Sequence, residues 1–484
     1  MDQKSSFETQ KQETKEVVKK VRRGKRWVDE SKITWHIAGP AILTAVAQFS
    51  FAFVTAAYCG HLGDVELAAV TEVQGVIEGF AFGAMLGMGS ALETLCGQAV
   101  GAGQFSMLGV YLQRSWIICC VTALFLSPLY IFTAPILKGL HQDKEVSEHA
   151  GKYAIYVIPQ LFAYALNFPM QKFLQSQSKV WVMTIISLVA LALHVLFNWI
   201  FVTKLELGLL GAAIAGNISW LLLVGALMLY IVAFGYFPES WSGFSTLAFK
   251  SLISFVKLSL SSAIMLCLEL WYPTAILLMV GGLKNSTNAV DVISVCMNVQ
   301  LWTLMIAIGF NASVSVRVSN ELGAGEPKDA KFAVVVNTLT SAVIGLVFAV
   351  LVISSRFHFP KMFTDKPRVI RDTSKLSYIL AGTIFLNSVQ PVLHGVAVGA
   401  GWQFQVALVN IGSYYIFGLP FAGLLGYKFN LRVWGIWSAM LGGTVLQTII
   451  LLFIVFRTNW RKEALQAEER VRTWGGQVVS EQSL

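Results

Sequence analysis

The sequence predicts an all-α membrane protein in which twelve transmembrane helices form two copies of one six-helix unit. Composition gives the first indication, because hydrophobic residues make up 55% of the 484 residues and charged residues only 13%. Ordinary soluble domains contain about 25% charged residues, so this chain cannot cover a water-exposed surface. The second indication is an internal repeat at about half the chain length. Together these observations predict a duplicated bundle in the lipid bilayer.

The repeat is clearest in two segments that end in Gly-Ala-Gly. Residues 101–103 close the run GSALETLCGQAVGAG, and residues 323–325 close NASVSVRVSNELGAG, 222 residues later. The same offset places Pro169 on Pro391. Parallel repeats of this kind are a common plan of membrane transporters, so the duplication favours a transport function.

Apolar segments long enough to cross a bilayer, at about 20 residues each, define the helices. The expected spans are 34–58, 67–92, 110–134, 150–171, 180–203, 209–234, 251–281, 290–315, 331–355, 375–399, 404–426 and 432–456. They divide the chain into an N-terminal arm (1–33), an N-lobe (34–235), a linker (236–250), a C-lobe (251–456) and a C-terminal tail (457–484).

Charges outside the spans predict the topology. Residues 1–33 are polar, lack the apolar core of a signal peptide, and are expected to form a disordered arm. Six Lys and Arg residues between 19 and 26 precede the first span, which favours a cytoplasmic N-terminus. An even number of spans then returns the C-terminus to the cytoplasm. Six basic residues between 356 and 375 oppose this assignment, because they would lie on the far side.

Several function classes lack support in the sequence. The net charge of +9 reflects the flanks of the spans, and no folded basic surface with stacking aromatics suits nucleic acid. There is no GxxxxGK[ST] loop for ATP and no GxSxG or HExxH motif, so neither an enzyme nor an ATP-driven pump is expected. The six cysteines lie in or beside apolar spans without zinc-site spacing, so we expect no metal and no cofactor.

Glu269 is the clearest candidate for chemistry inside the membrane. It lies near the middle of the seventh span, with no basic residue within a helical turn. An ionisable side chain near the bilayer centre costs at least about 2.5–3.5 kcal/mol. A lone carboxylate avoids this cost by binding a proton or a cation, which predicts a proton-coupling role. The alternative is a permanently protonated carboxyl that is bonded across helices for structure.

The repeat extends this hypothesis to a second acid. An offset of 221 places Gln48 of the first span on Glu269, and an offset of 222 places Glu78 of the second span on Gln300. Each half therefore has one acid and one amide. This pattern predicts Glu78 as a second proton-coupling residue and the two glutamines as residues of the substrate cavity.

Proline and polar residues mark where the bundles bend and where a cavity could lie. Pro169 and Pro391 interrupt backbone hydrogen bonding at equivalent places, and paired interruptions point to a central site and hinges. Asn387, Gln390 and His394 share one face of the tenth span at spacings of three and four. They are expected to face the cavity.

Aromatic residues are the last candidates for the cavity. Tyr272 and Trp302 are expected to line an apolar cleft for flat solutes. Aromatic residues in spans are also common as packing groups and interfacial anchors, so both interpretations stay open here.

Five motifs in order give the chain a family resemblance. They are CGHLG (59–63), LETLCGQAVGAGQ (92–104), CLE (267–269), RVSNELGAG (317–325) and GVAVGAGWQ (395–403). In this combination the chain resembles the plant branch of the multidrug and toxic compound extrusion transporters, the detoxification proteins, over about residues 34–460. The resemblance implies two six-helix lobes related by a pseudo-twofold axis, with a V-shaped cleft that opens alternately to either side.

The resemblance also implies an activity. Family members exchange protons for organic solutes such as flavonoids, alkaloids and xenobiotic cations, and Glu269 matches the acid of their seventh helix. Many members have an aspartate where this chain has Asn387, which cannot titrate. The expected partners are a small organic solute, protons and the lipid bilayer. We expect a monomer in the vacuolar or plasma membrane, driven by a proton gradient. The alternative is a passive anion channel or a flippase-type transporter on the same scaffold.

Overall fold

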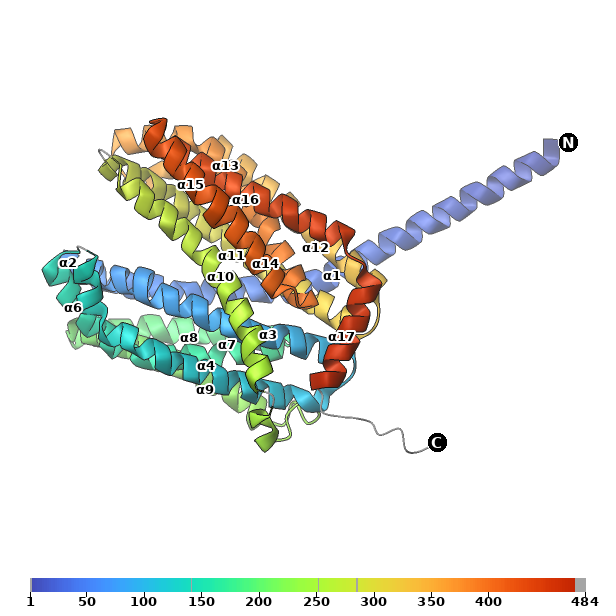
Figure 1. The fold of residues 1–484 in the computed structure, drawn as a ribbon, viewed down its shortest axis with the longest axis horizontal. Coiled ribbons are helices and arrows are strands. Elements are labelled where there is room, and N and C mark those ends of the chain that lie inside the picture. Colours follow the sequence, from blue (N-terminus) through green and yellow to red (C-terminus); the bar gives the residue numbers. More distant parts are fainter. Residues whose placement is uncertain (1, 141, 251, 284–285, 475–484) are drawn as a thin grey trace.

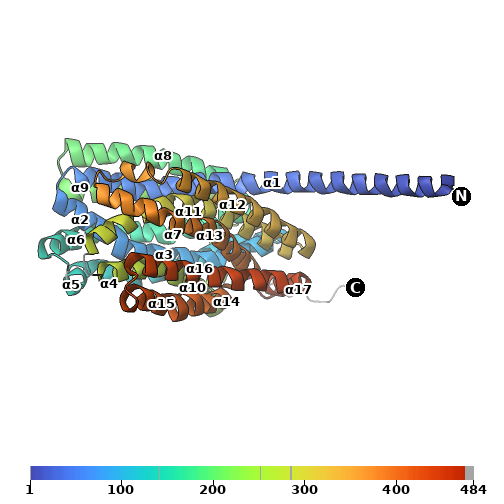
Figure 2. The ribbon, with the colours of Figure 1, turned by 90° about the horizontal axis from the view of Figure 1, so that it is seen from above.

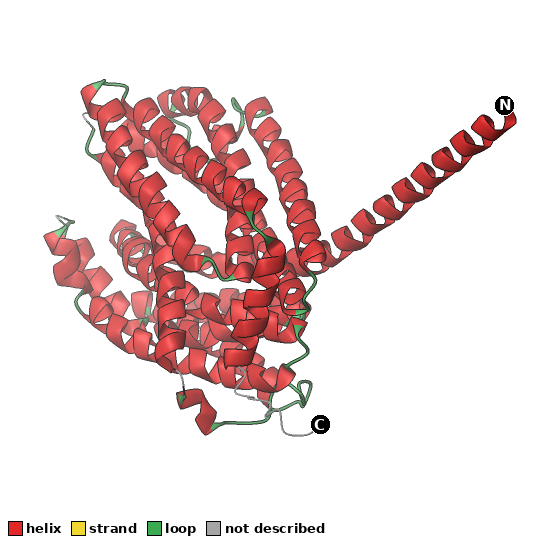
Figure 3. Ribbon diagram, turned by 45° about the vertical axis from the view of Figure 1, so that its right-hand side comes forward, coloured by secondary structure: helices red, strands yellow, loops and turns green. Residues whose placement is uncertain are grey.

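A computed structural model describes residues 2–140, 142–250, 252–283 and 286–474, with the backbone alone for residues 2–23 and 286–287. Regular structure in these residues is entirely helical (Figure 3). The helices form two bundles that meet at the end carrying both termini and diverge from there, so that the ribbon outlines a V (Figure 1). The all-α membrane fold predicted from composition and repeat is confirmed.

The spans of the N-lobe are built from the following elements: α1 (Asp2–Gly60), α2 (Asp64–Glu72) continued by η1 (Val73–Glu78) and α3 (Gly79–Gly101), α4 (Leu108–Ile131), α7 (Ile158–Ser176), α8 (Val180–Asn198) continued by η3 (Trp199–Lys204), and α9 (Gly208–Val232). Two shorter helices, α5 (Thr133–Gly139) and α6 (Lys144–Tyr156), lie between α4 and α7. The short 3₁₀ helices η2 (Phe105–Met107) and η4 (Thr246–Phe249) precede α4 and α10.

The C-lobe repeats this order. Its spans are α10 (Leu252–Gly281), α11 (Ser286–Gly323), α12 (Pro327–Ser354), α13 (Pro367–Ala400), α14 (Gln403–Asn410) continued by η6 (Ile411–Gly418), α15 (Leu419–Gly423) and η7 (Leu424–Lys428), and α16 (Arg432–Arg457). The 3₁₀ helix η5 (Phe359–Met362) precedes α13, and α17 (Trp460–Trp474) follows α16.

Eleven helices in the described part of the chain are long and apolar enough to cross a membrane. The twelfth span is α7, whose polar Asn167, Gln171 and Lys172 face the interior of the N-lobe instead of lipid. It begins later than the expected residue 150, because α6 is a separate helix. The Asp143 carboxylate caps α6, and Pro159, which has no backbone N–H, lies where the chain restarts as α7.

Helices continue into both tails, although the N-terminal arm was expected to be disordered. The helix α1 runs without interruption from Asp2, in keeping with the Lys, Glu and Gln residues that favour helix before the first span. At the other end, α17 is amphipathic, burying Trp460, Ala464, Ala467 and Val471 against the bundle. The last ten residues, 475–484, lie outside the described part of the chain.

Two equivalent helices, α1 and α10, cross between the lobes. The part of α1 around Thr34 packs on α11 of the C-lobe, and the part from Pro40 onward packs on α8 of the N-lobe. In the same way α10 packs on α3 of the N-lobe and on α14 of the C-lobe. Figure 2 shows α1 running along the whole molecule. The two lobes are thus joined by exchanged helices at the end that carries the termini.

Candidate functional site

Glu269 lies within the C-lobe and is not isolated. Gln390 Nε2 donates a hydrogen bond of 2.8 Å to Glu269 Oε1. His394 Nδ1 lies 2.6 Å from the other oxygen, Oε2. The His394 side chain is 2% exposed and that of Glu269 21%. The sequence-based picture of a lone acid is therefore wrong, because a basic side chain from α13 reaches it across the lobe.

A chain of buried polar side chains extends from this pair. Gln447 of α16 donates from Nε2 to Asn410 Oδ1 at 2.6 Å, and its Nε2 also lies 2.7 Å from His394 Nε2. Asn410 Nδ2 in turn donates to the backbone carbonyl of Met265 at 3.1 Å. The network connects four spans of the C-lobe: α10, α13, α14 and α16.

The carbonyl of Met265 fixes which group donates in each hydrogen bond of this side-chain network, since a carbonyl only accepts. Asn410 must present its NH₂ group to Met265, so its oxygen accepts from Gln447. The Gln447 NH₂ group then also donates to His394 Nε2, which leaves the imidazole proton on Nδ1. His394 therefore donates from Nδ1 to Glu269. A neutral His394 beside an ionised Glu269 with two N–H donors satisfies all of these contacts.

Two tyrosines close the network on one side. Tyr414 donates from its hydroxyl to Gln447 Oε1 at 2.8 Å and accepts from Gln390 Nε2 at 3.3 Å. The Tyr272 ring stacks on that of Tyr414 with centroids 4.3 Å apart. Tyr414 belongs to the π-helical segment η6, and π-segments are frequent at functional sites. Tyr272 is buried in this conformation, and its place in the substrate cavity remains a prediction.

The remaining cavity candidates are not in this network. Gln48 reaches Ser187 of α8 at 3.4 Å, within the N-lobe. The Oε1 atom of Gln300 is buried without a hydrogen-bond partner. Trp302 is 43% exposed and meets Phe49 of α1 edge to face, where the two lobes adjoin. Asn387 is half-buried, and no hydrogen bond of its side chain is found among the described residues.

Glu78 stands apart from Glu269. It ends the π-helical segment η1 in the second span, and its Oε1 atom is buried without a hydrogen-bond partner. No hydrogen bond or ion pair connects it with the C-lobe network among the residues described. Its proposed role as a second coupling residue remains a prediction.

Both prolines lie inside long helices, as expected. Pro169 is within α7 and Pro391 within α13. The carbonyl of Pro391 accepts a hydrogen bond of 2.6 Å from Asn311 Nδ2 of α11. His394 follows Pro391 by three residues, so the helix interruption lies next to the Glu269 network.

Sequence reasoning missed a second buried pairing of a carboxylate with a basic side chain. Lys172 Nζ of α7 lies 2.7 Å from Glu93 Oε2 of α3, with side chains 11% and 3% exposed. Lys172 follows Pro169 by three residues, and the 222-residue offset places it on His394. Applying the repeat to His394 could have revealed it.

No group of three His, Cys, Asp or Glu side chains suited to a metal occurs among the described residues. What the structure offers instead is a buried hydrogen-bond network around Glu269 inside a duplicated twelve-span bundle. This combination defines a polytopic membrane transport protein. The MatE family model matches residues 40–200 and 261–424, one match in each lobe. The chain belongs to the multidrug and toxic compound extrusion family, whose members are transporters and not enzymes.

Named relatives agree with this assignment. The chain is 55% identical to Protein DETOXIFICATION 29 of Arabidopsis thaliana over 449 residues, covering 93% of this chain and 90% of that protein. It is 54% identical to Protein DETOXIFICATION 33 of the same plant over 452 residues, or 93% of each chain. The predicted resemblance to the plant detoxification proteins is thus confirmed.

Solved structures show the same fold. The eukaryotic MATE transporter AtDTX14 superposes with a TM-score of 0.88 at 34% identity, covering 92% of this chain and 99% of that one. The Vibrio cholerae MATE transporter VcmN, in its bent form, gives a TM-score of 0.78 at 17% identity, with 93% and 99% coverage. The twelve-helix, two-lobe architecture is therefore shared with solved members of the family.

Proposed function

We propose that the protein exports organic solutes from the cytosol in exchange for protons, by alternating access to a site between the lobes. The observation that supports this most is the Glu269 carboxylate within a membrane span, held by two N–H donors. A carboxylate there can exist in two protonation states. Its hydrogen-bond partners make the two states structurally different.

Proton uptake by Glu269 would conflict with the bonds around it. An added proton on Oε2 would face the Nδ1–H group of His394. The conflict is relieved when His394 moves its proton to Nε2, but Gln447 already donates to that nitrogen. Gln447 would then have to turn its amide and give up its bond to Asn410. Proton binding is thereby linked to the packing of α10, α13, α14 and α16 around the bend at Pro391.

Such linkage is what exchange requires. A ligand shifts a conformational equilibrium only by its difference in affinity for the two states. Protons would favour the rearranged network, and a solute would favour the ionised one. Because both act on one equilibrium, solute release accompanies proton binding on the acidic side.

The aromatic residues where the lobes adjoin suggest the class of solute. Trp271 of α10 stacks on Phe80 of the N-lobe with centroids 5.0 Å apart, and Trp302 meets Phe49 of α1. Both tryptophans retain exposed surface. Flat ring faces suit planar aromatic solutes, including cationic ones. Flavonoid, alkaloid and xenobiotic-like solutes are therefore proposed.

The basic cluster before the first span supports cytoplasmic termini, in either the vacuolar or the plasma membrane. Both termini lie at the end where the lobes meet (Figure 1). With cytoplasmic termini, the present conformation would be closed to the cytosol. The proposal then places uptake of the solute in the opposite state.

A passive anion pathway is the second candidate, supported by the basic residues between 356 and 375. Two of these cations already have partners: Lys366 Nζ lies 2.9 Å from Asp291 Oδ2, and Arg356 bonds to the Tyr378 hydroxyl. Because both side chains already have partners, they do not form a set of free cations that would attract anions. This favours the exchange mechanism.

Transport by the full-length protein in sealed vesicles tests the proposal. A pH gradient is imposed, and a panel of flavonoid glycosides, alkaloids and small anions is offered. Uptake that follows the pH gradient and collapses with a protonophore is expected. A current that follows voltage and anion concentration, and ignores the pH gradient, would establish the passive alternative.

A further inference from the structure

The two segments that reveal the repeat pack directly on each other, at the end where the lobes meet. Gly97 of α3 faces the Ser319 side chain of α11, and these positions are repeat equivalents. A side chain at Gly101 would meet the carbonyl of Asn320, and one at Gly323 would meet the carbonyl of Gln98. The contact is therefore reciprocal about the pseudo-twofold axis. Only glycine allows the helices this close.

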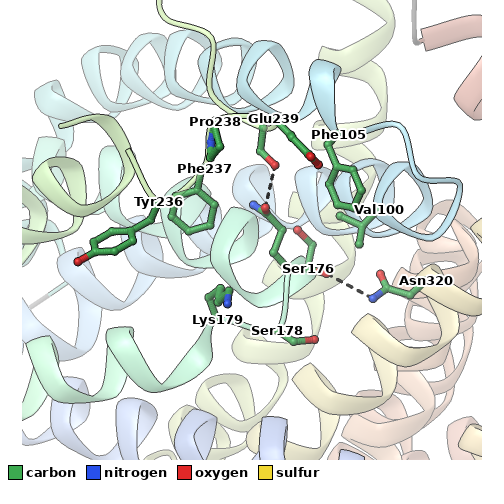
Figure 4. A pocket seen from close by; sticks show the side chains of 12 residues that line it. Val100, Phe105, Ser176, Ser178, Lys179, Tyr236, Phe237, Pro238, Glu239 and Asn320 are labelled. Carbon is green, nitrogen blue, oxygen red and sulfur yellow. Dashed lines mark hydrogen bonds between the residues drawn. The ribbon is translucent and has the colours of Figure 1, made fainter. Parts of the chain in front are cut away.

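Each segment also donates a side-chain hydrogen bond to the end of a proline-containing helix in the opposite lobe. Gln98 Nε2 of the N-lobe donates 3.1 Å to the carbonyl of Gly399, near the C-terminal end of α13. Its repeat equivalent Asn320 Nδ2 of the C-lobe donates 3.3 Å to the carbonyl of Ser176, at the end of α7. Figure 4 shows the second bond beside an open pocket of about 480 Å³.

Further contacts strengthen the first of these bonds. Thr94 Oγ1 donates 2.5 Å to the carbonyl of Val398 and accepts 2.7 Å from Gln403 Nε2. Arg470 of α17 donates 2.8 Å to the carbonyl of Ala400. Burial lowers the pKa of Arg470, which stays charged because an arginine guanidinium titrates far above neutrality. The last turn of α13 is thus held by the N-lobe and by α17.

We propose that Gln98 and Asn320 form two equivalent amide clasps that close the transporter at its terminus-bearing end, and that they position α13 and α7 for opening. The clasps rest on the proposed alternating access, since the lobes must part at this end in the opposite state. Each clasp joins one lobe to the helix that contains the other lobe's proline. His394, the partner of Glu269, lies on the same helix, α13, as the carbonyl of Gly399 that the first clasp binds. Bending at Pro391 would pull Gly399 away from Gln98.

The expected effect of removing a clasp follows from the size of one hydrogen bond. A neutral bond contributes about 0.5–1.5 kcal/mol, which corresponds to about a two- to tenfold shift of the open–closed equilibrium. Removing both should shift it by about four- to a hundredfold if they act independently. A bond that only supported folding would leave this equilibrium unchanged.

Labelling of a cysteine in the seam measures the equilibrium directly. Ser319→Cys is introduced into full-length protein whose six native cysteines are replaced, and an impermeant maleimide is applied from the side of the termini. Gln98→Met, Asn320→Leu and the double variant are compared with the parent. Gln113→Leu is the matched control, because Gln113 also donates to a backbone carbonyl, that of Gly243, but not across the lobes.

Faster labelling in both single variants, fastest in the double variant and unchanged in Gln113→Leu, is the expected result. Equal labelling rates in all variants would overturn the clasps. If Gln98→Met folds poorly, Gln98→Asn, which shortens the side chain by one methylene, takes its place with the same expectation. Because labelling needs no proton gradient, a failure of proton coupling in the vesicle assay would not produce these outcomes.

Discussion

Lys172 and His394 are equivalent residues of the two repeats, and each binds a carboxylate inside the membrane region. Lys172 pairs with Glu93 at 2.7 Å, and His394 with Glu269 at 2.6 Å. The carboxylates, however, come from non-equivalent spans, α3 in the N-lobe and α10 in the C-lobe. The repeat has kept the basic position next to each proline while the acid changed place. Only His394 is an imidazole, which can hold its proton on either ring nitrogen.

The Lys172–Glu93 pair should matter chiefly for stability. Glu93→Gln leaves the Lys172 ammonium buried without its counter-ion, and breaking a buried pair typically costs about 3–5 kcal/mol. We expect a clearly lower melting temperature of the purified protein. Replacing both residues, as Glu93→Gln with Lys172→Met, should recover most of the loss. A single variant as stable as the parent would contradict the pairing.

Gln447 should control the tautomer of His394. Gln447→Leu removes the donor to His394 Nε2, so the imidazole can hold its proton on either nitrogen. We expect slower pH-driven flux with little change in the solute concentration at half-maximal rate. Thr448→Val, one residue further along α16, removes only a bond within the helix and serves as the control. Equal losses in both variants would indicate general disruption of α16.

Asn387→Asp should add a titratable group to the face of α13 that holds Gln390 and His394. Many family members have an aspartate at this position, whereas Asn387 cannot titrate. Glu269 is therefore the acid of the C-lobe network. With a second carboxylate on the face that holds Gln390 and His394, we expect more protons to be exchanged per solute. The pH gradient that just balances a known solute gradient measures this ratio. A ratio that is unchanged from the parent, and from an Asn387→Ser control, would disprove the prediction.

Glu78→Gln should lower turnover a few-fold or move the pH optimum, while transport persists. Its Oε1 atom is buried without a hydrogen-bond partner, so a change in its protonation would alter the N-lobe locally. The pH profile of transport is compared with the parent at matched expression, with Asp64→Asn at the exposed start of α2 as the control. Superimposable profiles and equal rates would leave Glu78 a structural acid.

Much of the fold could be predicted from the sequence, because lipid imposes both length and hydropathy on a span. The exception was α7, which has a buried polar face and begins at 158 instead of 150 because α6 is a separate helix. The arm before residue 34 was misjudged for another reason. Polarity was taken as disorder, although its lysines and glutamates favour helix and Glu30 meets Arg317 of α11 at 2.8 Å.

The candidate site was predicted in part. Glu269 was found from its cost in lipid, and Gln390 and His394 from their spacing along one helix. The bond between His394 and Glu269 joins residues of two helices and needs the packed lobe to become visible. Nothing in the sequence pointed to Asn410 and Gln447, since a single amide within a span has no pattern that links it to other residues. Their role depends on the series of hydrogen bonds whose donors and acceptors are fixed by the Met265 carbonyl.

Glu269→Gln tests the central claim most directly. The amide keeps the shape of the side chain and loses the titratable proton, so solute uptake driven by a pH gradient should fall to background. Exchange of labelled for unlabelled solute, which needs no net proton movement, should persist in the same vesicles. Full gradient-driven uptake by Glu269→Gln, at parental expression, would contradict the assignment of Glu269 as the proton carrier.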